Sequence, residues 1–258
     1  MKVLFGLFGL FGFFFTVATP VSAAETKVVD PLDSPQWTVM HHLYLNDEAV
    51  IFDDKVKIYA PEFAEDSMNV PVSFDASELK DIQEIVVIAD LNPIPLVLRY
   101  FPQEISPYLA FRIKLQQGSP VRVAVKTGDN IWHVGSTWVD ASGGGCTLPS
   151  VGTSTGDWSS TLGLVSANIW ERSDDIPNRL RIKVMHPMDT GLAPGIPKFH
   201  IDKMTISDKQ GKQLARLEVY EPISENPMLS LGVDKYEYLK INGRDNNGNI
   251  INAEVVKR

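Results

Sequence analysis

The chain has 258 residues, of which 44% are hydrophobic and 22% charged, and its acidic residues outnumber its basic ones to give a formal net charge of −8. This composition is typical of a globular protein and excludes a disordered or collagen-like chain. The acidic balance and the lack of any run rich in Lys and Arg argue against a nucleic-acid-binding surface.

Residues 1–24 predict a secretory signal peptide. Lys2 precedes an apolar run from Val3 to Val17, and small residues follow, with cleavage expected after Ala23 or Ala24. Threonines and a proline interrupt the run before it reaches the roughly 20 apolar residues that a membrane span needs. We therefore expect export through the general secretory route to the periplasm, with no membrane segment after cleavage.

Residues 25–140 predict a first β-sandwich, preceded by one short helix. Ser34 and Pro35 are typical of an N-cap and a first helical position, and apolar residues follow at helical spacing from Trp37 to Tyr44. Further along, short apolar or alternating segments separated by turn residues have the spacing of an antiparallel sandwich. These expected strands are residues 55–60, 69–74, 84–90, 94–101, 108–115, 120–125 and 130–138.

Residues 141–161 have a different composition, because two-thirds of them are Gly, Ser or Thr. Such a stretch is typical of a flexible linker, and it carries Cys146, the only cysteine of the chain. Residues 162–258 predict a second, smaller sandwich after an ambiguous apolar stretch at its start. Its expected strands are residues 179–186, 199–208, 213–221, 228–233, 236–245 and 249–257.

Most sites for a metal or a cofactor can be excluded from the sequence. The five histidines lack metal-ligand spacing, and the glycines before Cys146 lack the lysine of a phosphate-binding loop. The run from Asp245 to Asn249 lacks the acidic residue that would close a calcium loop, so it predicts a hairpin turn. We expect no cofactor and no bound metal.

Cys146 admits two interpretations. It could be an incidental free thiol, or it could be the attachment point for a covalent cargo, since cysteine takes up and releases sulfane sulfur through its thiolate. Gly143, Gly144 and Gly145 would form a flexible arm that leaves the thiol unpacked. With no second cysteine and no neighbouring base in the sequence, an enzyme such as a thiol oxidoreductase is disfavoured. The residues alone leave cargo carrier and idle thiol equally open.

Several stretches carry a resemblance to the Sox sulfur-oxidation proteins. In the first part of the chain AEDSMNVPV, DLNPIPL and SPYLAFRIKL resemble SoxY, the sulfur-carrier subunit; in the second part RIKVMHPMDTGL and ISENPMLSL resemble its partner SoxZ. These stretches are residues 64–72, 90–96, 106–115, 181–192 and 223–231. The chain is thus similar to the fused SoxYZ-like carriers associated with quinoprotein dehydrogenases.

The resemblance implies an immunoglobulin-like sandwich in each half and a non-enzymatic carrier that holds sulfur intermediates covalently. Cys146 matches the family's cargo cysteine, and Gly144 and Gly145 match the glycines that precede it. Where the family has trailing glycines this chain has the residues 147–149, and it continues into the SoxZ-like half. His186, in the HPMDTG motif, is a candidate for contact with the cargo, although turn geometry alone would explain that motif.

The main hypothesis is a periplasmic, non-enzymatic carrier that holds sulfur or sulfur-containing intermediates on Cys146 and presents them to partner enzymes. The partners would be periplasmic sulfur-metabolism enzymes, such as those of thiosulfate oxidation, or a quinoprotein dehydrogenase system. The alternative is a non-catalytic immunoglobulin-like adaptor that docks on a periplasmic quinoprotein dehydrogenase. Whether the chain forms a homodimer is left open.

Overall fold

The structure is a computed structural model that describes residues 29–150, 158–173, 176–234 and 236–257. The predicted signal peptide lies outside these residues. Within them the chain is mostly β, with a single α-helix, as the sequence predicts. No helix in these ranges is long and apolar enough to cross a membrane.

The first half contains all seven strands that the sequence predicts there, together with two short ones that it does not. The two additions, β1 and β3, are only three and two residues long. The elements are α1 (Trp37–Leu45), β1 (Val50–Phe52), β2 (Lys57–Tyr59), β3 (Phe63–Ala64), β4 (Val70–Asp75), β5 (Ile82–Ala89), β6 (Leu96–Phe101), β7 (Tyr108–Ile113), β8 (Ser119–Thr127) and β9 (Trp132–Ala141).

The second half likewise contains its six predicted strands, and the ambiguous apolar stretch at its start forms one more, β10. The elements are the 3-10 helix η1 (Trp158–Ser160), β10 (Val165–Trp170), β11 (Asn178–Val184), β12 (Ile201–Ser207), β13 (Gln213–Val219), β14 (Met228–Val233), β15 (Tyr238–Asp245) and β16 (Ile250–Val256). Residues 246–249 form the predicted hairpin turn between β15 and β16, in which the Asp245 carboxylate accepts the backbone N–H groups of Asn247 and Asn249.

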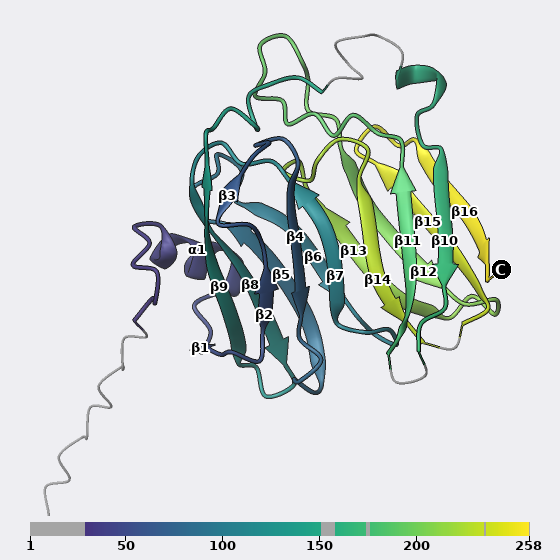
Figure 1. Cartoon of the computed structure of the whole chain (residues 1–258), viewed down its shortest axis with the longest axis horizontal. Coiled ribbons are helices and arrows are strands. Elements are labelled where there is room, and N and C mark those ends of the chain that lie inside the picture. The colour runs from purple at the N-terminus through teal and green to yellow at the C-terminus, as the bar shows by residue number, and fades with distance from the viewer. Residues whose placement is uncertain (1–28, 151–157, 174–175, 235, 258) are drawn as a thin grey trace, which may run out of the picture.

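The two halves lie side by side and share both layers of one long sandwich (Figure 1). One sheet has ten strands, of which nine follow the order β1-β9-β8-β5-β6-β13-β12-β15-β16, and the other has six in the order β10-β11-β14-β7-β4-β2. The halves join where β13 pairs with β6 over four residue pairs and where β14 pairs with β7 over two. Each sheet therefore runs without a break from one half into the other.

A single apolar core fills the space between the sheets and extends through both halves. It includes Phe74, Ile85 and Leu109 in the first half and Leu180 and Ile206 in the second, all with no exposed surface. Burial of this continuous core holds the two halves together, because separating them would expose apolar side chains at the join to water.

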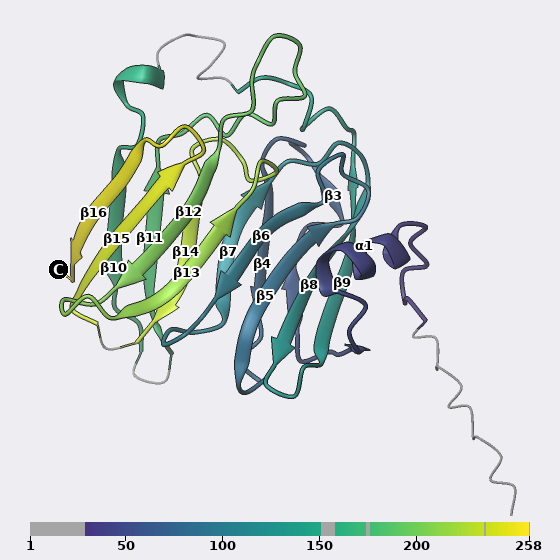
Figure 2. The same ribbon diagram turned by 180° about the vertical axis from the view of Figure 1, so that it is seen from behind.

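A second apolar cluster lies outside the ten-stranded sheet, where α1 covers strands of the first half (Figure 2). Trp37 and Met40 of the helix pack there against Val86 and Trp132 of the sheet. The helix is confirmed, but the expected cap is wrong: the N-cap position is Gln36, with no side-chain cap bond. Ser34 instead closes a turn before the helix, in which its carbonyl accepts the N–H of Trp37.

Candidate functional site

The cysteine lies at the end of the sandwich where β9 finishes. We call residues 142–150 the cysteine segment; in Figure 1 this end of the sandwich is at the top. The segment is held by loops of both halves, so it lies across the line where they join. Residues 151–157, the rest of the predicted linker up to η1, are outside the described part of the chain.

The expected glycine arm packs against the fold in this structure. Gly144 and Gly145 donate their N–H groups to the carbonyls of Gln116 (3.2 Å) and Leu115 (3.1 Å), while Gly143 donates to Ser67 Oγ (3.3 Å). A Cβ at Gly145 would come within 2.1 Å of the Ser67 carbonyl oxygen. The glycines thus permit close backbone packing, where the sequence predicted freedom from it.

Cys146 is 1% exposed and lies against the residues that follow β7. Its thiol donates to the Lys114 carbonyl (S to O, 3.7 Å), and its backbone N–H donates to Gln116 Oε1 (3.3 Å). Asn92 fixes this loop, because its side-chain amide donates to the Lys114 carbonyl (2.8 Å) and accepts the Gln116 N–H (2.9 Å). The thiol is therefore enclosed by a loop whose own hydrogen bonds are well satisfied.

The second half holds the cysteine segment from the other side. The Thr190 hydroxyl donates to the Cys146 carbonyl at 2.6 Å, and Asp189 Oδ1 accepts the backbone N–H of Ser150 at 2.9 Å. Both residues belong to the HPMDTG motif, in which Gly191 adopts a φ of +80° as the predicted turn requires. This motif therefore contacts the backbone of the cysteine segment at Cys146 itself and on its C-terminal side, at Ser150.

Lys114 is a buried cation that joins the two halves beneath the cysteine. Lys114 is 2% exposed; its ammonium donates to the carbonyls of Met188 and Glu221, and its backbone N–H donates to the Pro222 carbonyl. Both ammonium acceptors are neutral carbonyls. These contacts compensate the positive charge only in part. Carboxylates that lie farther away stabilise the charged form by long-range electrostatic attraction.

Burial shifts the protonation of both groups toward their neutral forms. It raises the pKa of the Cys146 thiol to about 11, against an opposing effect of the nearby Lys114 charge. It lowers the pKa of Lys114 to about 8, although Cys146 and several carboxylates favour the charged form. In this arrangement the thiol is protonated at neutral pH and shielded from reagents, since the thiolate is the reactive form.

His186 makes its contacts within the second half. Its Nδ1 accepts the Met188 N–H (3.0 Å), its Nε2 lies 3.5 Å from Asp245 Oδ2, and its ring lies 4.4 Å from that of Phe199. Burial lowers the pKa of the imidazole to about 4. The motif residues that reach the cysteine segment are Asp189 and Thr190, and His186 supports them from behind through its bond to Met188.

The stretches that resemble SoxY and SoxZ, scattered over 168 residues of sequence, come together around the cysteine segment. They supply Ser67, Asn92 and Lys114 from the first half and Asp189 and Thr190 from the second. The fifth stretch closes the group, because the hydroxyl of its Ser224 donates to the Met68 carbonyl at 2.7 Å.

Sequence reasoning missed most of these contacting residues. The motifs themselves could have directed attention to Asn92, Asp189 and Thr190, whereas Gln116 lies outside every motif. In the described ranges no group of three or more His, Cys, Asp or Glu side chains is arranged to hold a metal ion.

Comparison with known proteins gives one family for each half. Residues 40–146 match the family described as sulfur oxidation protein SoxY, and residues 170–256 match that described as sulphur oxidation protein SoxZ. The first match ends at Cys146. Among solved structures, the sulfur carrier protein SoxY from Chlorobium limicola f thiosulfatophilum is similar at 19% identity over 42% of this chain and 96% of its own, with a TM-score of 0.37. No curated protein matches the chain.

Proposed function

The chain belongs to the SoxY and SoxZ families as a fusion of the two, and we propose that it is a periplasmic carrier that holds sulfur or sulfur-containing intermediates on Cys146. The observation that carries the proposal is the convergence of the SoxY-like and SoxZ-like stretches on the segment that contains the only cysteine. The carrier presents its cargo to periplasmic sulfur-metabolism enzymes and catalyses no reaction itself.

Loading requires the cysteine segment to leave its place. A thiol that is 1% exposed has no room for an added sulfur, and its raised pKa leaves little thiolate. Once released, the thiolate attacks a sulfane sulfur of the donor, an S–S bond forms, and the donor's leaving group departs with the bonding electron pair. The hydrogen bonds from Thr190 and to Gln116 are the contacts that have to break first.

Intact mass spectrometry of protein purified from its native source without reductant tests the proposal. A reducible adduct on Cys146 with the mass of sulfur or of a thiosulfonate is expected, and Cys146→Ser protein prepared in parallel should lack it. A bare thiol in protein isolated during active sulfur oxidation, or an adduct that persists in the variant, would contradict the proposal.

Burial of the thiol favours one alternative, a non-catalytic adaptor that docks on a periplasmic quinoprotein dehydrogenase. An adaptor has no need of an accessible cysteine, which agrees with the protonated and enclosed state of Cys146. The two functions differ in one experiment. Sulfur oxidation by cells that depend on this protein is lost on Cys146→Ser substitution if it is a carrier, and persists if it is an adaptor.

A further inference from the structure

The outer face of the six-stranded sheet, which faces the viewer in Figure 1, carries a row of cations on β11. Arg179, Arg181 and Lys183 alternate with Leu180, Ile182 and Val184, which have no exposed surface and face the core. The period-two pattern of a strand therefore places all three cations on the outside. Arg112 is likewise exposed on β7, two strands away in the same sheet. We call these four residues the basic face.

The neighbours of the β11 cations on the adjacent strands are uncharged. The register places Trp170, Asn168 and Ser166 of β10 and Gly232, Ser230 and Met228 of β14 beside Arg179, Arg181 and Lys183 respectively. None of the four cations of the basic face forms an ion pair with any residue that the structure describes. No described acidic residue therefore compensates the charge of this face.

The ten-stranded sheet shows the opposite arrangement. There the register places acidic residues directly beside cations. One of these register pairs, Lys240 with Glu254, is itself an ion pair. Two other cations form ion pairs with nearby acids, Lys126 with Glu48 and Arg99 with Glu84. The pairs in register are Lys126 with Glu84, Arg99 with Glu218, Lys203 with Glu218 and Lys240 with Glu254. In a chain of net charge −8, unpaired cations on one sheet face need a physical explanation.

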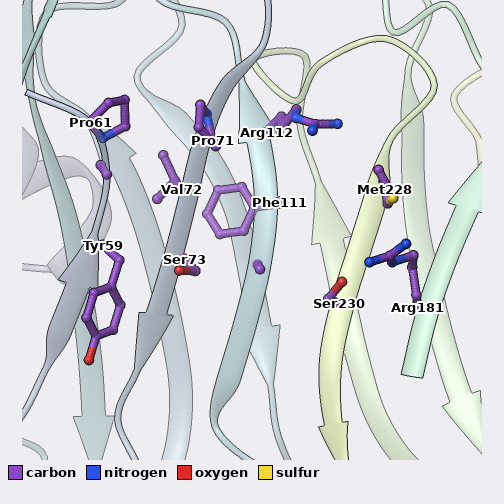
Figure 3. A pocket seen from close by; sticks show the side chains of 12 residues that line it. Tyr59, Pro61, Pro71, Val72, Ser73, Phe111, Arg112, Arg181, Met228 and Ser230 are labelled. Atoms are coloured by element: carbon purple, nitrogen blue, oxygen red, sulfur yellow. The ribbon is translucent and has the colours of Figure 1, made fainter. Parts of the chain in front are cut away.

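A depression of about 490 Å³ adjoins the basic face and spans the line where the halves join. Its lining includes Tyr59 and Ser73 from the first half and Arg181, Met228 and Ser230 from the second. Figure 3 shows Tyr59 at one side of the depression and Arg181 with Met228 at the other. Because both halves contribute to its walls, the depression exists only when they are joined.

The dimensions of the basic face suit an extended polyanion better than a single small anion. From Arg179 to Lys183 is four strand residues, about 13 Å, and from β11 to β7 is two strand spacings, about 10 Å. Exposed Tyr59 and Trp170 flank the cations, and the Arg181 guanidinium lies 5.1 Å from the Trp170 ring centroid. Arginine, tyrosine and tryptophan are the residue types that contribute most to protein interfaces.

We propose that the basic face and its depression form the docking surface for an acidic segment of a partner protein. Charge complementarity would steer that segment onto the face and orient it, while the depression receives an apolar side chain. Arg112 lies two residues before Lys114, whose carbonyl contacts the thiol, so a docked partner would lie beside the cysteine segment. That this partner is an enzyme acting on the cargo rests on the proposed carrier function.

A fluorescein-labelled hexaglutamate peptide is the first probe, with binding measured by fluorescence anisotropy at low salt. The double variant Arg181→Glu with Lys183→Glu should bind at least tenfold more weakly than the unmodified chain. The double variant Lys203→Glu with Lys240→Glu, which changes the net charge equally but on the ten-stranded sheet, should bind within twofold of it. Equal weakening in both variants, or no binding by the unmodified chain, would overturn the proposal.

Photo-crosslinking identifies the occupant in cells of the source organism. A benzophenone amino acid at Asn168, beside Arg181, should crosslink a peptide of another protein rich in Asp and Glu, and the Arg181→Glu with Lys183→Glu change should abolish the product. The same probe at Asn242, on the ten-stranded sheet, is the control. Crosslinks to a second copy of this chain, to lipid, or to a peptide without excess acid would contradict docking by an acidic partner.

The two proposals can fail separately, because docking uses the face and loading uses the thiol. Cys146→Ser protein should bind hexaglutamate and give the Asn168 crosslink as the unmodified chain does. Charge-dependent docking without any sulfur adduct on Cys146 would contradict the carrier function but support the docking surface. An adduct on Cys146 together with binding that does not depend on the basic face would support the carrier function and contradict the docking surface.

Discussion

Arg122 and Lys114 are both buried cations, but their partners differ in kind. Arg122 has no exposed surface and faces two carboxylates, Asp90 through Nε and Asp30 through both terminal nitrogens, at 2.7–3.0 Å. Its guanidinium also lies 4.5 Å from the Trp37 ring centroid. Among the residues that the structure describes, the acceptors of the Lys114 ammonium are two neutral carbonyls, those of Met188 and Glu221.

The difference distinguishes a strongly bonded region around Arg122 from a more weakly bonded one around Lys114. Arg122 attaches the segment before α1 to the first half through charge-assisted bonds to Asp30 that are largely buried. Lys114 joins the two halves beneath the cysteine segment with bonds that leave its charge poorly compensated, as its lowered pKa reflects. We therefore expect the join beneath Cys146 to open at less cost than the Arg122 cluster.

The largest expected effect is that of Arg122→Met. Removing the guanidinium leaves Asp90 and Asp30 buried without a cation, so the free energy of unfolding should fall by about 3–5 kcal/mol. Urea unfolding monitored by tryptophan fluorescence measures this. Arg99→Met, which breaks the partly exposed Arg99–Glu84 pair, is the control and should cost below about 1 kcal/mol. Equal losses of stability in the two variants would show that Arg122 contributes no more than a partly exposed ion pair.

The charge of Lys114 predicts a pH dependence of stability. The pKa of Lys114 is about 8 in the folded state, whereas a lysine in the unfolded chain has the ordinary value of 10.5. Between these two values the unfolded chain holds a proton that the folded chain has released. Stability should therefore rise with pH across this window, by about 3 kcal/mol relative to Lys114→Met. Both chains should carry Cys146→Ser, because the raised pKa of the thiol has the opposite effect between pH 9.0 and 11. If stability changes with pH in the same way in both chains, the lowered pKa of Lys114 is contradicted.

His186 provides a test on the acid side. Its pKa is lowered from 6.5 to about 4, so the unfolded chain takes up a proton in this range before the folded chain does. Stability should fall as pH decreases from 6.5 to 4, by about 3 kcal/mol more than in His186→Asn. Asparagine retains an acceptor for the Met188 N–H, which makes the comparison one of charge. The same fall in both chains would assign it to other groups.

These comparisons concern features that the sequence revealed only in part. Strands could be predicted because inward residues such as Leu180 and Ile182 alternate with polar ones. The pairing of β6 with β13 could not, because their partners lie more than a hundred residues apart and nothing local specifies the match.

At the site, the cysteine and the motifs were visible in the sequence, but their packing was not. Three successive glycines favour either flexibility or close approach, and only the position of the Ser67 carbonyl decides between them. Lys114 lies between buried Ile113 and Leu115, where alternation predicts an exposed side chain. The second half covers it, and sequence periodicity within one strand carries no information about that cover.

The smallest expected effect is the most direct test of the join. Thr190→Val removes one hydrogen bond to the Cys146 carbonyl, at a cost of about 1 kcal/mol to the closed arrangement. The thiol should then react with Ellman's reagent about fivefold faster, since the rate follows the population of open molecules. Thr205→Val, which removes a similar bond to the Asn242 carbonyl far from the cysteine, should leave the rate unchanged. If both variants accelerate the reaction equally, the thiol becomes accessible through global unfolding; if only Thr190→Val does, the cysteine segment opens on its own while the Arg122 cluster remains folded.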